Sequence, residues 1–184
     1  MKRCLIFAAW CSMGFKITLS PGAYLCAALL VLLLPVNWWT GAVLSAAAHE
    51  LSHMAAIYAT GGKVYGISVG PGGARMDTMA ATRGREVLRA AAGPLGSLVF
   101  AFLCRGFPEA AVCAVIQGLY NLLPVYPLDG GRILRGFLPD SICAGIGTFT
   151  RIMLLGLGLW GAVNLHLGLL PLIPGCAVAF RTRK

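Results

Sequence analysis

The sequence predicts an all-α polytopic membrane protein with about six transmembrane helices and a small β-hairpin at the membrane surface. Of its 184 residues, 58% are hydrophobic and only 11% are charged, whereas soluble domains carry about 25% charged residues. Mean hydropathy is +0.80. Glycines, prolines and charged residues divide the chain into apolar segments of the kind that cross bilayers. We expect one domain over residues 1–184.

The N-terminal third predicts a short strand and two membrane helices. Residues 1–20 end in the strand-forming run 16–19, and we expect this segment to be retained because no clean signal-peptide cleavage site follows its apolar part. The first clear span is 22–34. Thr40 is the expected N-cap of the second helix, which ends at the Gly61-Gly62 pair.

The sequence changes to a strand-like pattern over residues 63–78. Val64, Ile67 and Val69 favour strands, and the Gly-Pro-Gly-Gly run at 70–73 favours a turn. We expect a β-hairpin inserted at the membrane surface. The edge of its first strand could pair with an extended peptide.

The rest of the chain predicts four further spans and one amphipathic piece. Pro124 and Pro127 break the chain before Asp129, and an amphipathic segment then runs to Leu138. The expected spans are 86–104, 109–122, 145–163 and 167–180.

The charge distribution favours a bilayer over nucleic acid as the partner of this basic chain. The formal net charge is +9. Six spans would put both termini on one side together with most Lys and Arg, which predicts that this side is cytoplasmic. The seven cysteines include no CxxC pair, so we expect small buried apolar residues rather than a disulfide framework.

The segment His49-Glu50-Leu51-Ser52-His53 carries the clearest chemical signal. Histidines four residues apart lie on one face of a helix and can bind one metal ion, and the glutamate between them can act as a base. Titratable groups inside an apolar helix are costly and favour a functional role. A catalytic zinc site needs a third protein ligand.

Asp129 is the strongest candidate for that third ligand. It follows a proline-broken segment, and irregular backbone at membrane depth persists where it is packed in protein or lines a polar cavity. The alternative is that Asp129 caps the helix over 130–138. The other candidates are Asp77, Glu86, Glu109, Asp140 and His166.

Three motifs together resemble the site-2 protease family of intramembrane zinc metalloproteases. They are the HELSH segment, Ala-Gly-Pro-Leu at 92–95, and the run at 121–131 that contains Asn121 and ends in Asp-Gly-Gly. The resemblance implies one Zn²⁺ per chain, held by His49, His53 and Asp129. It also implies that Glu50 is catalytic and that Asn121 positions substrate or stabilises the oxyanion.

The resemblance is closest to the branch typified by the sporulation protease IVFB, with two departures. Ser97 stands where the family often has Asn, and neither a CBS nor a PDZ domain accompanies the core. We expect Gly93 and Ser97 to be packing residues and His166 to be an interfacial histidine. Arg132 and Arg135 are expected to be cytoplasmic anchors.

These observations predict a zinc-dependent intramembrane endopeptidase in a bacterial-type cytoplasmic or forespore membrane. It would cleave transmembrane or membrane-proximal segments of regulatory proteins near the cytoplasmic face, pro-sigma factors included, with membrane regulators as further partners. The alternatives are a catalytically silent relative that binds membrane segments and a metal transporter. An intact Glu50 argues against the first, and the apolar outer half of the helices argues against the second.

Overall fold

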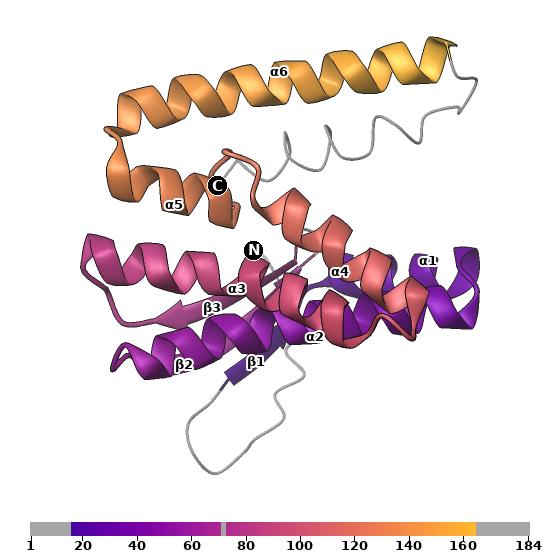
Figure 1. The fold of residues 1–184 in the computed structure, drawn as a ribbon, viewed down its shortest axis with the longest axis horizontal. Coiled ribbons are helices and arrows are strands. Elements are labelled where there is room, and N and C mark those ends of the chain that lie inside the picture. The colour runs from indigo at the N-terminus through magenta and orange to yellow at the C-terminus, as the bar shows by residue number, and fades with distance from the viewer. Residues whose placement is uncertain (1–15, 71–72, 165–184) are drawn as a thin grey trace, which may run out of the picture.

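The structure, a computed structural model, describes residues 16–70 and 73–164. Over these ranges three short strands accompany six helices (Figure 1). The strands are β1 (Lys16–Leu19), β2 (Val64–Gly70) and β3 (Gly73–Thr78). The helices are α1 (Pro21–Leu33), α2 (Val36–Ala59), α3 (Arg83–Leu103), α4 (Pro108–Asn121), α5 (Asp129–Phe137) and α6 (Asp140–Asn164).

Helices α2, α3 and α4 form the packed centre of the molecule. Small residues allow their backbones to approach closely. A methyl group on Gly41 of α2 would lie 3.0 Å from the Cα of Ala110 on α4, and one on Gly118 of α4 would lie 3.3 Å from the Cβ of Ser97 on α3. The short helix α5 packs on α3, and α6 lies on the other side of α5 from α3 (Figure 1).

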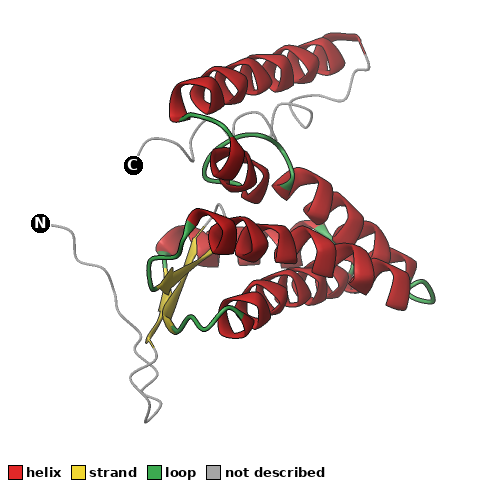
Figure 2. Ribbon diagram, turned by 60° about the vertical axis from the view of Figure 1, so that its left-hand side comes forward, coloured by secondary structure: helices red, strands yellow, loops and turns green. Residues whose placement is uncertain are grey.

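The strands form one sheet in the order β1-β2-β3, beside the N-terminal half of α3 (Figure 2). The predicted hairpin is confirmed, since β2 and β3 pair antiparallel. The predicted strand at 16–19 also forms, and it pairs parallel with β2. Strand β2 is therefore paired on both sides, which corrects the prediction that its edge is open to a peptide. Among the described strands, β3 lies at the edge of the sheet.

Several helix boundaries differ from the prediction. Thr40 is not an N-cap, because α2 already begins at Val36 after the extended backbone of Pro35. The Thr40 hydroxyl donates to the Val36 carbonyl at 2.7 Å inside the first turns. Helix α6 begins at Asp140. The predicted span 167–180 and His166 lie outside the described residues.

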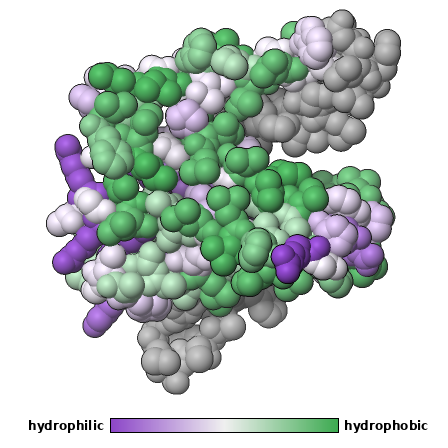
Figure 3. All heavy atoms as spheres, in the orientation of Figure 1, coloured by the Kyte–Doolittle hydropathy of each residue, from purple (hydrophilic) through white to green (hydrophobic). Residues whose placement is uncertain are grey.

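Two of the described helices, α3 and the first 22 residues of α6, are long and apolar enough to cross a membrane, and α1 is a shorter apolar helix. Helix α4 has 14 residues, about 21 Å of rise against a hydrocarbon core of about 30 Å. The number of six spans therefore stays a prediction. Figure 3 shows apolar side chains over much of one face, with hydrophilic ones gathered mainly along one edge.

Candidate metal centre

Both histidines of the HELSH segment lie on the buried stripe of α2. The buried residues of this helix recur at every fourth position: Gly41, Ser45, His49, His53 and Ile57. Such a row stays on one side of a helix. The exposed fractions of His49 and His53 are 2% and 7%, and their Nε2 atoms lie 3.2 Å apart. The predicted pairing of the two rings is confirmed.

Asp129 meets the two histidines from α5. Its Oδ2 lies 3.2 Å from His49 Nε2 and 3.1 Å from His53 Nε2, and the residue is 5% exposed. Leu128 is the N-cap of α5 and Asp129 is its first residue. The alternative in which Asp129 caps this helix is therefore wrong.

The three side chains fit a zinc ion. The ligand atoms that His49, His53 and Asp129 offer all lie within 4.8 Å of one another. Two imidazole nitrogens and one carboxylate oxygen form a donor set that catalytic zinc uses, with the fourth position left for water or substrate. The other acidic candidates from the sequence, Asp77, Glu86, Glu109 and Asp140, are not members of this group.

Helix α3 fixes the orientation of both rings. The Nδ1–H of His53 donates to the Arg89 carbonyl at 2.7 Å, and His49 Nδ1 lies 2.8 Å from the Ser97 hydroxyl. These contacts leave both Nε2 atoms facing Asp129. Hydrogen bonds to the second ring nitrogen set the tautomer and orientation of metal-binding histidines. Ser97 does pack, as predicted, but it also orients a ligand.

Gly93 lies directly against the two rings. A methyl group at this position would overlap His53 Nε2 and would come within 2.8 Å of His49 Nε2. Any larger residue at this position would therefore displace the histidine nitrogens that face Asp129. Arg89, Gly93 and Ser97 follow one another at intervals of four on α3. That spacing is visible in the sequence and could have identified the stripe facing α2.

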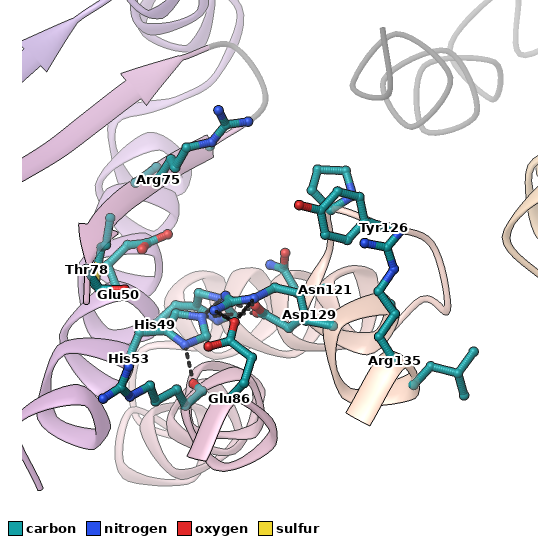
Figure 4. Close-up of a pocket in the computed structure, with 18 of the residues that line it drawn as sticks. His49, Glu50, His53, Arg75, Thr78, Glu86, Asn121, Tyr126, Asp129 and Arg135 are labelled. Carbon is teal, nitrogen blue, oxygen red and sulfur yellow. Dashed lines mark hydrogen bonds and ion pairs between the residues drawn. The ribbon is translucent and has the colours of Figure 1, made fainter. Parts of the chain in front are cut away.

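A cavity of about 1260 Å³ opens beside this cluster. Its walls come from helices α2 to α6, from strands β2 and β3 and from the segment before α5, and Glu50 and Asn121 are among the lining residues (Figure 4). Glu50 follows His49 in α2 and lines the same cavity as both histidines and Asp129. The Asn121 amide donates to the Gln117 carbonyl at 3.1 Å within α4. The catalytic roles predicted for Glu50 and Asn121 remain proposals.

Residues 22–126 match the family described as Peptidase M50B-like, which is more than half of the chain. The chain belongs to this family. The match includes both histidines, Glu50, Gly93 and Ser97, and it ends before Asp129. The evidence that Asp129 belongs to the site is its position beside the histidines in the structure, because the family match does not reach it.

Two further comparisons agree with this membership. Over 58 residues the chain is 43% identical to Rip3 of Mycobacterium tuberculosis, found in two strains, whose name describes it as a zinc metalloprotease. That match covers 27% of this chain and 15% of the relative. The site-2 protease from Methanocaldococcus jannaschii has the same fold, with a TM-score of 0.69 and 22% identity over 96% of this chain and 95% of that one.

The predicted membership of the site-2 protease family is therefore confirmed. The family match and the cluster of His49, His53 and Asp129 together support a metal site of the zinc peptidase kind at these residues. The family is membrane-embedded, in keeping with the two long apolar helices. The sporulation branch is not addressed by these comparisons and stays a prediction.

Proposed function

We propose that the protein is a zinc-dependent intramembrane endopeptidase. The observation that carries the proposal is the convergence of His49, His53 and Asp129 in a cavity that Glu50 also lines. A glutamate carried next to a metal cluster is the arrangement that peptide hydrolysis needs.

The cavity residues would have three different roles in peptide hydrolysis: metal binding, proton transfer and substrate positioning. His49, His53 and Asp129 would hold the ion, and zinc bound there acts as a Lewis acid toward water and the scissile carbonyl. Glu50 accepts a proton from the attacking water and returns it to the leaving amine. Asn121, in the cavity wall, would position the substrate backbone or donate to the oxyanion.

The outer edge of β3 is the proposed docking strand for the substrate. A peptide bond becomes accessible when the substrate is extended, and an extended segment can add to a sheet edge through backbone hydrogen bonds. Arg75, Met76, Asp77 and Thr78 of β3 line the cavity, whereas β2 is already paired on both sides.

Disulfide cross-linking tests this docking edge. In a cysteine-free background carrying Glu50→Gln, a cysteine at Met76 should cross-link to a cysteine near the cleavage site of a bound substrate. A cysteine at Tyr65, which is exposed on β2 and does not line the cavity, serves as the matched control. Equal cross-linking at both positions would contradict docking at β3.

The proposed substrates are transmembrane or membrane-proximal segments of regulatory proteins, pro-sigma factors included, cut near the cytoplasmic face. His53 lies eight residues before Gly61, which is about 12 Å along a helix. The site would therefore lie inside the bilayer, about that far from the membrane face rich in Lys and Arg. Both termini would be cytoplasmic. Labelling of cysteines placed at Gly84 and Gly106 from each side of the membrane tests this orientation.

Glu50→Gln tests the function directly. The protein should be co-expressed with candidate single-span substrates, and the variant should lose cleavage while it keeps zinc. Unchanged cleavage would contradict the role of Glu50. A wild type that binds substrate without cutting it would indicate the silent relative, and zinc uptake into vesicles would indicate the transporter.

A further inference from the structure

Arg132 contacts the oxygen of Asp129 that faces away from the histidines. Its Nη1 donates to Asp129 Oδ1 at 3.3 Å, one helical turn along α5. Asp129 Oδ2 faces both histidine Nε2 atoms. The carboxylate is therefore engaged on both sides, by the metal cluster and by a guanidinium.

Glu86, in the first turn of α3, holds that guanidinium in place. Arg132 donates to Glu86 Oε1 through Nη2 at 2.6 Å and through Nε at 3.1 Å. One turn further along α5, a methyl group on Gly136 would overlap the side chain of Val87 on α3. Helix α5 is thus fixed to α3 at two neighbouring points.

The same helix α3 therefore supports all three predicted metal ligands. It reaches His53 through the Arg89 carbonyl and His49 through the Ser97 hydroxyl. It reaches Asp129 indirectly, through Glu86 and Arg132. The prediction that Arg132 is a cytoplasmic anchor is untested, but its guanidinium also lies against the predicted metal ligand Asp129.

The Arg132–Glu86 pair is too exposed to contribute much stability by itself. The side chains are 32% and 39% exposed, and ion pairs of that exposure are largely screened. Orientation is the larger effect, because two donors of Arg132 fix the planar guanidinium on Glu86 and thereby direct Nη1 at Asp129. Glu86 also balances the positive charge of Arg132, which would otherwise repel a cation bound to the same carboxylate.

We propose that Arg132 is a positioning residue for the metal ligand Asp129 and that Glu86 holds Arg132 in the orientation this requires. The pair sets how tightly the site retains zinc, through the direction in which Asp129 Oδ2 points. The proposal rests on the zinc site proposed above and assigns a new role to two residues outside it.

Zinc affinity is the readout, and Arg135 provides the matched control. Arg135 lies on the same helix, stacks over Tyr126 and pairs with the exposed Asp140, but it does not contact a metal ligand. In the purified full chain carrying Glu50→Gln, chelator competition should show zinc binding about 10- to 100-fold weaker for Arg132→Ala. Arg135→Ala should bind zinc like the parent, and Glu86→Gln should fall between the two.

A charge swap separates positioning from simple tethering of two helices. Glu86→Arg combined with Arg132→Glu restores the ion pair between α3 and α5, but it places a second carboxylate beside Asp129. The proposal predicts that thermal stability of the zinc-free protein returns toward that of the parent while zinc affinity stays low. Arg132→Lys should recover part of the affinity, and its Co²⁺ absorption spectrum should show an altered ligand geometry.

Two outcomes would contradict the positioning role of Arg132, and a third would contradict the zinc site as well. Restored zinc affinity in the swapped variant, or parental affinity in Arg132→Ala, would overturn the positioning role. A parent protein that bound no zinc at all would overturn the zinc site and the positioning role together. Because zinc is measured in a Glu50→Gln background, failure to find a cleaved substrate leaves this test unaffected.

Discussion

The two halves of the metal centre are built in different ways. His49 and His53 reach it from successive turns of one helix, so their pairing follows from local spacing alone. Asp129 comes from a segment 76 residues after His53, and its position depends on how α5 docks on α3. The α2 half, His49 and His53, is therefore set by helix geometry. The α5 half, Asp129, is set by tertiary packing.

Gly93→Ala should cause the largest effect, because it blocks the α2 half at its centre. The added methyl group would overlap His53 Nε2 and crowd His49 Nε2. We expect zinc binding weakened by at least about 100-fold, the upper end of the range for neighbours of a metal site. The measurement is zinc affinity by chelator competition.

Gly84→Ala is the matched control on the same helix, since nothing lies within 4 Å of a methyl group there. It should leave zinc affinity unchanged. If Gly93→Ala bound zinc as tightly as this control, the crowding read from the structure would be wrong.

Gly131→Ala should displace Asp129, and it should weaken zinc binding less than Gly93→Ala does. Its methyl group would overlap the backbone at Val125 and Tyr126, so α5 must shift and carry Asp129 with it. Because both histidines stay in place, we expect zinc binding to weaken by about 10- to 100-fold. Gly145→Ala, where the space is open, serves as the control. If Gly131→Ala weakened zinc binding as much as Gly93→Ala, the position of the histidines would depend on the packing of α5, which would contradict this contrast.

Ser97→Ala should have the smallest effect of the three. It removes one contact to His49 Nδ1 from a fully buried position, while Asp129 and Gly93 continue to confine the ring. We expect about 10-fold weaker zinc binding with little change in the overall fold by circular dichroism. Unchanged affinity would mean that the hydroxyl does not orient the ring.

The same contrast explains how much could be predicted from the sequence. The histidine pair and the β-hairpin depend on spacing and turn residues close together in the chain. Asp129 was found because prolines and glycines frame it. The supporting roles of Ser97, Gly93 and Arg132 were missed because they depend on how α3 lies against α2 and α5.

Pairing between distant strands was missed for a similar reason. The strand-forming run at 16–19 was recognised, but its pairing with β2 joins residues 50 positions apart, as in the Thr18–Ser68 hydrogen bond. No local pattern encodes that register. The sequence therefore favours β2 as the docking edge, whereas the pairing of β2 on both sides leaves β3 as the proposed edge.

Bound zinc after exhaustive dialysis tests the central claim most directly. The claim is that the centre exists only when α5 brings Asp129 to the α2 histidines. Elemental analysis should find one zinc per chain in the wild type and in Glu50→Gln, and none in His53→Ala or Asp129→Ala. A full complement of zinc in Asp129→Ala would contradict the account, because the α2 half would then hold the metal alone.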